Sequence, residues 1–114
     1  MPHIIVEQSA DVKTMLDPQV LCKLLFEAAF ETGVFASPAA IKVRVHTADA
    51  VLMGTDIQSF VHAEMRMLAG RTNDEKTKVT SALLAILTTN LPDVGNLSVD
   101  ICDLHDSAYT KRVL

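Results

Sequence analysis

Proline at the second position is the residue of this chain whose type and place most directly suggest chemistry. It is small enough next to the initiator for Met1 to be removed, which would leave Pro2 with a free secondary amine. An α-amino group has a reference pKa of roughly 7.7–8.0, close to what a general base needs at neutral pH. Burial or neighbouring cations would lower that pKa further, because both disfavour the charged form. Many chains begin with Met-Pro and make no use of it, so these two residues alone favour no catalytic role.

A second group of candidate residues is cationic and lies in two separate stretches. Lys42, Arg44 and His46 share one parity of an alternating segment, so they would project from one face of a strand and could bind an anion. The solvated face of an antiparallel sheet gives the same pattern and is the more common explanation. Arg71 comes just before an expected helix, where a guanidinium and backbone N–H groups would suit a carboxylate. An ordinary surface arginine would fit that position equally well.

Two helices that could position these residues are predicted from capping signals and apolar periodicity. The first spans about 18–32, with Asp17 as its N-cap and Gly33 as the left-handed residue after its end. The second spans about 73–90 and begins with a Thr-x-x-Glu capping box that starts at Thr72. Both segments carry apolar residues at helical spacing, so each helix should bury one face.

Alternation of apolar and polar residues predicts the strands, which we place at 2–7, 41–47, 60–68 and 97–104, with a short extra strand at 51–53. The order predicts an α+β fold for a single domain over 1–114, with two β-α-β units at about 2–47 and 60–104. These units would form a four-stranded mixed sheet with two helices on one face. The ferredoxin-like split arrangement has the same order, so the pattern does not choose between them. Met65 and Met67 take the apolar parity and are expected in the core.

Composition and charge argue against several classes of function. The net charge is −4, aromatic residues are only 4%, and no dense basic patch is present, which argues against nucleic acid as a partner. No apolar run approaches the ~20 residues of a membrane span, and the N-terminus lacks the pattern of a signal peptide. Cys22 and Cys102 lie in apolar segments, so we expect small buried hydrophobes of a reducing cytoplasm rather than a disulfide. No Cys/His spacing suggests zinc.

With these motifs placed, the chain resembles the 5-carboxymethyl-2-hydroxymuconate isomerases of the tautomerase superfamily. The strongest match is the opening Met-Pro-His-x-Ile-Val-Glu at 1–7. The other matches follow in family order, namely Thr-Gly-Val-Phe at 32–35, Arg-Val-His at 44–46, Phe-Val-His at 60–62 and Ala-Gly-Arg at 69–71. Each motif is short, but their order and spacing together are fairly specific and extend to about residue 104.

The resemblance implies a homotrimeric isomerase of aromatic compound catabolism that needs neither a cofactor nor a metal. It implies that Pro2 shuttles a proton during ketonisation of a dienol that bears several carboxylates. Arg71 and Lys42 would bind those carboxylates and stabilise charge on the substrate oxygen, with Arg44 as a weaker candidate. Lys42 stands where the family has an arginine, which keeps the charge but loses the planar bidentate fork.

A different class of function stays open, a non-catalytic small-molecule-binding or assembly module of ferredoxin-like type in which Pro2 is incidental. Removal of Met1 distinguishes the two, because a retained methionine leaves Pro2 as an amide without basicity. We expect His46 and His62 to be structural, since nothing in the sequence ties either to the proline. The C-terminal segment is shorter than in the family members it resembles, so we expect any wall that a longer tail supplies to be missing.

Overall fold

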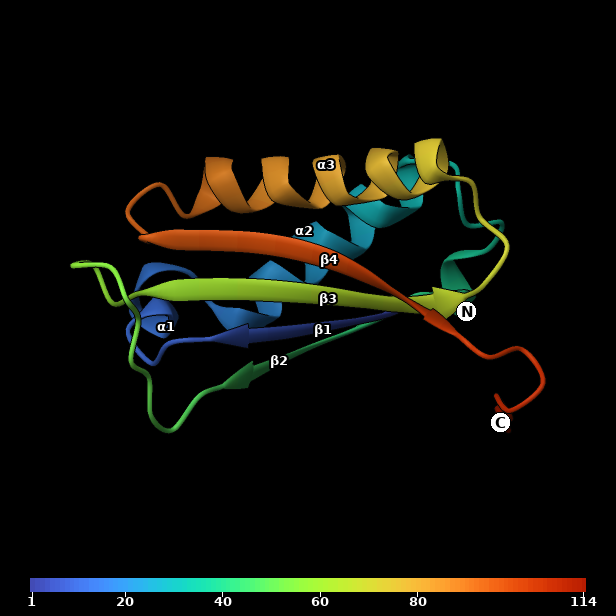
Figure 1. The fold of residues 1–114 in the computed structure, drawn as a ribbon, viewed down its shortest axis with the longest axis horizontal. Helices are drawn as coiled ribbons and strands as arrows, with labels where there is room; N and C mark the ends of the chain where they lie inside the picture. Colours follow the sequence, from blue (N-terminus) through green and yellow to red (C-terminus); the bar gives the residue numbers. More distant parts are fainter.

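In the computed structural model, which describes residues 1–114, four strands form one sheet and two long helices cover one of its faces (Figure 1). The elements in chain order are β1 (His3–Gln8), α1 (Val12–Met15), α2 (Pro18–Glu31), the 3-10 turn η1 (Pro38–Ala40), β2 (Lys42–Thr47), β3 (Phe60–Leu68), α3 (Asn73–Asn90) and β4 (Asn96–Leu104). The predicted sheet with two helices on one face is confirmed.

The strand order of the sheet is β2-β1-β3-β4. β1 pairs with β2 in parallel and β3 pairs with β4 in parallel, while the two central strands β1 and β3 run antiparallel. Each helix therefore connects two neighbouring parallel strands. In a split arrangement each crossover would pass over an intervening strand, so the topology selects the two adjacent β-α-β units. That the two halves are repeats of one unit stays a prediction.

Both long helices begin at the caps that the sequence predicts. Asp17 accepts a hydrogen bond from the backbone N–H of Gln19 at 2.7 Å, and Gly33 takes a φ of 75° after the end of α2. At α3 the Thr72 hydroxyl accepts from the backbone N–H of Glu75, and the Glu75 carboxylate accepts from the backbone N–H of Thr72. These caps satisfy donors that helix ends leave unpaired, so the helix boundaries are set locally.

The secondary structure differs from the prediction in two places, an additional helix and a strand that does not form. The sequence showed no helix at α1, because four residues are too few to display a helical period; buried Val12 anchors this turn. The short strand expected at 51–53 is a loop instead. There the Gln58 side chain bonds both the N–H and the C=O of Met53, at 2.8 and 3.0 Å, so this backbone is satisfied without a partner strand.

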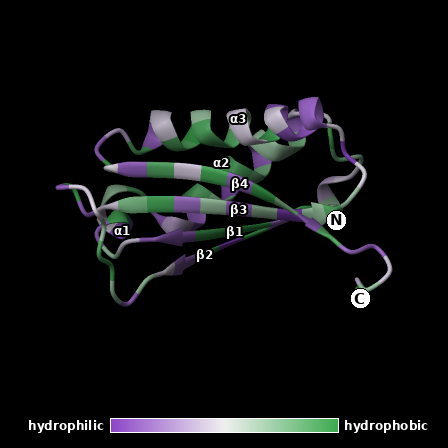
Figure 2. Cartoon of the chain, in the orientation of Figure 1, coloured by the Kyte–Doolittle hydropathy of each residue, from purple (hydrophilic) through white to green (hydrophobic).

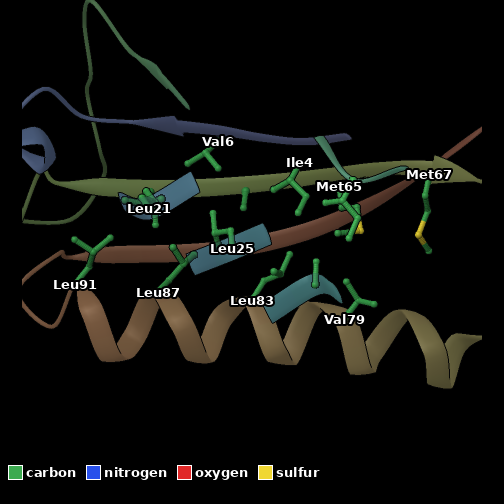
Figure 3. Close-up of a cluster of buried hydrophobic side chains, with 14 of the residues drawn as sticks. Ile4, Val6, Leu21, Leu25, Met65, Met67, Val79, Leu83, Leu87 and Leu91 are labelled. Carbon is green, nitrogen blue, oxygen red and sulfur yellow. The ribbon is translucent and has the colours of Figure 1, made fainter. Parts of the chain in front are cut away.

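The core lies between the helices and the sheet and contains 17 buried apolar residues (Figure 3). Leu25 of α2, Leu83 of α3 and both Met65 and Met67 of β3 belong to this core, and all four are fully buried. The prediction that both methionines belong to the core is confirmed. Burial of each such side chain contributes roughly 1.5–3 kcal/mol, so this layer fixes the sheet that carries the candidate site.

No helix is both long enough and apolar enough to pass through a bilayer.

The opposite face of the sheet carries no helix (Figure 1). Hydrophilic and hydrophobic residues alternate along the strands (Figure 2), and because the buried apolar residues face the helices, the polar ones lie mostly on this opposite face. Ile5 and Glu64 lie on it half-buried, while Arg66 is exposed and contacts the Glu64 carboxylate at 2.6 Å. We call this surface the open sheet face. Cys102 also lies here and is exposed, so its expected burial was wrong. It has the parity opposite to the apolar residues of β4. Cys102 and the half-buried Cys22 are both free thiols, as predicted.

Candidate active site

Pro2 is buried at the start of β1, and backbone pairing fixes its position. Its carbonyl oxygen accepts a hydrogen bond from the backbone N–H of Lys42 at 3.1 Å, which extends the parallel pairing of β1 and β2 by one residue. The proline ring also restricts φ to a narrow range. An amine at Pro2 would therefore stand at one defined place at the end of the sheet.

Met1 precedes Pro2 in this chain, and its amino group lies among three cations. Burial, followed by the positive charges of Arg71, Lys42 and Lys111, lowers the pKa of this amino group below its ordinary value. A lower pKa leaves more of the amine neutral near pH 7, which is the form a general base requires. Removal of Met1 would transfer the terminal amine to buried Pro2, so burial would act on its pKa in the same direction.

Lys42 begins β2 and turns its side chain toward the chain terminus. Its Nζ donates to the carbonyl oxygen of Ala40 at 2.7 Å and lies 2.7 Å from the Met1 sulfur. A thioether is a weak acceptor, so the methionine satisfies this ammonium poorly. Burial and the nearby charge of Lys111 lower the pKa of Lys42.

Arg71 reaches the same place from the connection between β3 and α3. Gly70 has a φ of 115°, a backbone conformation that residues other than glycine rarely adopt. The turn at Gly70 places Arg71 directly before Thr72, the N-cap of α3. The guanidinium carbon lies 5.6 Å from the centre of the Phe35 ring. This distance is within the range of a cation–π interaction, so the half-buried arginine is oriented by the ring.

Arg44, the weaker candidate, is not brought to this cluster. Its Nη1 lies 3.3 Å from Nδ1 of His3, on the open sheet face. A guanidinium can only donate, so His3 Nδ1 accepts and the imidazole proton lies on Nε2, which then donates to the Tyr109 hydroxyl at 2.9 Å. Burial, followed by the charge of Arg44, lowers the pKa of His3, which is consistent with a neutral ring.

The other two histidines of the strands lie farther along the sheet. His46 of β2 and His62 of β3 both pair with Glu7, four positions along β1 from His3. His62 Nδ1 lies 2.6 Å from the hydroxyl oxygen of Ser98, and His46 is exposed. This placement is consistent with the structural role expected for both.

Sequence reasoning missed three residues of this end of the molecule. Phe35 was recognised only as part of a short motif, and nothing indicated its contact with Arg71. Tyr109 and Lys111 lie in a tail without periodicity, yet the tail contacts His3 and the Met1 sulfur. That the chain lacks a wall that a longer tail would supply stays a prediction, although the tail present here does reach the N-terminus. The only feature of the sequence that could have indicated a role for the tail was the cation Lys111, in a segment without helical or strand periodicity.

The cluster at the N-terminus is open to solvent in the single chain. The largest hollow, with a volume of about 440 Å³, lies between α2 and β2 and is lined by Cys22, Phe26 and Val43 among others. Neither Pro2 nor Arg71 lines any hollow of the chain. No three His, Cys, Asp or Glu side chains gather in a group that could hold a metal ion. The candidate site is therefore defined by its charges and contacts rather than by a cavity.

Comparison with known proteins gives matches in sequence and in fold. The sequence profile of the family described as 5-carboxymethyl-2-hydroxymuconate isomerase matches residues 2–109. A 5-carboxymethyl-2-hydroxymuconate isomerase from Deinococcus radiodurans R1 has a similar structure, with a TM-score of 0.81 and 22% identity over 97% of this chain and 88% of that chain. A 5-carboxymethyl-2-hydroxymuconate delta-isomerase gives a TM-score of 0.74 and 18% identity, over 99% of this chain and 88% of that one.

A fused 4-OT described as a wild type symmetric trimer has the same fold, with a TM-score of 0.74 and 19% identity over 96% of this chain and 90% of that chain. At these identities the structural likeness shows the fold alone. No curated protein matches the sequence.

Proposed function

Because the chain belongs to the 5-carboxymethyl-2-hydroxymuconate isomerase family, we propose that it is an isomerase that ketonises 5-carboxymethyl-2-hydroxymuconate or a similar unsaturated 2-hydroxy polycarboxylate. The observation that best supports this is the convergence of Arg71 and Lys42 on the chain terminus, where Pro2 enters the sheet. The reaction needs a neutral amine beside cations that bind carboxylates. The lowered pKa of the terminal amino group, caused by burial and then by the charges of Arg71, Lys42 and Lys111, supports this assignment.

In the proposed reaction Met1 has been removed and the Pro2 nitrogen is the base. Its lone pair takes the proton of the 2-hydroxy group of the dienol. The electrons of the broken O–H bond form the carbonyl, the conjugated double bonds shift, and a carbon further along the system takes the proton back from the Pro2 ammonium. The product is an isomer of the substrate, so no proton or electron is gained or lost. Such proton transfer typically contributes 10²–10⁴-fold to the rate.

The two cations of the site have different geometries and so different roles. Arg71 presents a planar fork, held over Phe35, that can bind one carboxylate through two parallel hydrogen bonds. Lys42 is a compact point charge, which suits a second carboxylate or the oxygen on which negative charge develops. Arg44 stays the weaker candidate, because its guanidinium is engaged by His3 on the open sheet face.

We propose further that the subunits assemble as a homotrimer. The similarity in fold to a 4-OT described as a symmetric trimer supports this assembly. The open sheet face has no helix over it and is available for contacts between subunits (Figure 1). A trimer would also allow a neighbouring subunit to cover a site that is open in the single chain.

The decisive test compares protein that retains Met1 with protein from which Met1 has been removed. Both populations are defined by intact mass and assayed by ultraviolet absorbance with mono-, di- and tricarboxylate dienols. We expect the trimmed protein to be active and the retained form to lose activity by about 100-fold or more, because an amide nitrogen cannot accept the proton.

Pro2→Ala provides a matched control, because it still yields a terminal amine after trimming and should be impaired rather than inactive. Full activity in protein that entirely retains Met1 would refute the proline mechanism. A lack of activity in both populations would favour the non-catalytic binding module.

A further inference from the structure

The C-terminal tail returns to the N-terminus after β4 ends at Leu104 (Figure 1). A turn follows in which the carbonyl oxygen of His105 accepts from the backbone N–H groups of Ala108 and Tyr109, both at 3.1 Å. The Tyr109 hydroxyl then meets His3 Nε2 at 2.9 Å, and the two rings pack edge to face with centroids 6.0 Å apart. His3 is the residue after Pro2, so this contact holds the tail beside the candidate site.

Two residues beyond Tyr109, the tail places a third cation at the terminus. Lys111 Nζ lies 3.6 Å from the Met1 sulfur, and Lys42 Nζ lies 2.7 Å from the same atom. The two ammonium groups therefore lie close to one weakly accepting atom, Lys42 from the start of β2 and Lys111 from the C-terminal tail. Their proximity also appears in the pKa of Lys42, which burial and Lys111 both lower.

Neither Lys42 nor Lys111 forms an ion pair with a carboxylate. The ion pairs of the chain join Lys23 to Glu27, Arg66 to Glu64 and Lys76 to Asp103, all outside this cluster. Like charges without a counter-ion repel one another, so the gathering does not serve stability. Its geometry suits an anion that would replace the sulfur as the acceptor between the two ammonium groups. Loss of Met1 would clear that position and free the Pro2 nitrogen in a single step.

We infer that Lys111 is a specificity-determining residue of the site, which together with Lys42 binds one carboxylate of a polycarboxylate while Arg71 binds another. This inference rests on the proposed function for the identity of the substrate, but it concerns binding and can be tested without turnover. Tyr109 acts through Lys111 and positions it by its contact with His3.

The test measures binding of propane-1,2,3-tricarboxylate, which cannot react, to Met1-trimmed protein by calorimetry. The variants are Lys111→Met, Lys111→Arg and the matched control Arg112→Met, which removes a charge from the adjacent position of the exposed tail. Loss of one charge-assisted contact predicts about 10-fold to 150-fold weaker binding for Lys111→Met. Arg112→Met should stay within about twofold of the wild type, and Lys111→Arg should keep most of the affinity. Circular dichroism checks that each variant is folded.

Several results would overturn the inference. One is a wild-type affinity for the tricarboxylate in Lys111→Met, and another is no binding of the tricarboxylate by the wild type. A third is a loss of affinity in Arg112→Met equal to that in Lys111→Met, because this would indicate a general effect of net charge. Failure of the proposed function looks different. A protein that binds the tricarboxylate through Lys111 but isomerises no dienol refutes the isomerase and keeps the inference. An active isomerase whose Lys111→Met variant keeps the wild-type kcat/KM and Kd refutes the inference alone.

Discussion

Replacement of Arg71 by alanine should harm substrate capture more than it harms folding. The guanidinium of Arg71 makes one contact of structural value, the cation–π interaction with Phe35 at 5.6 Å. The cap of α3 does not depend on the arginine, because Thr72 and Glu75 satisfy each other's backbone. The fold therefore has little to lose at this position, whereas the proposed site loses the group that binds one carboxylate.

The expected loss of folding stability in Arg71→Ala can be compared with the expected loss of substrate binding. An exposed cation–π contact is worth about 0.5–1 kcal/mol, and Arg71 is half-buried, so we expect about 1 kcal/mol of lost stability. A hydrogen bond to a charged group contributes about 1.5–3 kcal/mol, which corresponds to roughly a 10-fold to 150-fold fall in kcat/KM. Arg71→Lys keeps the charge but loses the fork and the flat face over Phe35, so its kcat/KM should fall between those of the wild type and Arg71→Ala.

The assay pairs kcat/KM on the best dienol with thermal unfolding at one fixed protein concentration, since the proposed assembly would make Tm depend on concentration. Arg112→Ala serves as the control for the loss of one positive charge. The reasoning is refuted if Arg71→Ala keeps the wild-type kcat/KM, because Arg71 would then be an ordinary surface arginine. It is refuted equally if loss of the folded state accounts for the whole loss of activity.

Two further predictions concern the terminal amine and the assembly. The kcat/KM of trimmed protein should rise with pH and level off above the pKa of the Pro2 amine, which we expect burial and cations to hold below its ordinary value, as they do for the pKa of the Met1 amino group. Arg71→Ala should move this rise to higher pH, because a positive charge is removed. A profile that falls over the same range would contradict a neutral-amine base. Light scattering at micromolar concentration should report three subunits, and a monomer would count against the proposed assembly.

The features that could be predicted from the sequence are those with local causes. The caps at Asp17 and Thr72 and the alternation of the strands depend on residues within a few positions, so the helices and the four strands were predicted nearly to the residue. The loop at 51–53 was misjudged because Gln58 is the residue that satisfies its backbone, and a side chain that replaces a strand leaves no period in the sequence.

The candidate site was predicted less completely, because side chains on the same face of a strand need not contact the same group. Lys42 and Arg44 share a parity on β2, yet Lys42 turns to the chain terminus while Arg44 bonds His3. Lys111 lies 110 positions from Met1 in the chain, and only the course of the tail brings them together. No pattern of residue types reports such a contact.

Strand order explains why the candidate residues meet at one end of the molecule. β1 and β2 run parallel to each other and antiparallel to β3 and β4. The first residues of β1 and β2 therefore lie at the same end of the sheet as the last residues of β3 and β4. Pro2 precedes β1, Lys42 begins β2, Arg71 follows β3 and Lys111 follows β4, so each strand brings one of these residues to the same end of the sheet. α3 also starts there, and its N-terminus favours negative charge. A split arrangement would keep these strand directions but would separate β1 from β2 in the sheet. The backbone bond between Lys42 and Pro2 would then be lost, and this bond is what places a cation beside the terminal amine.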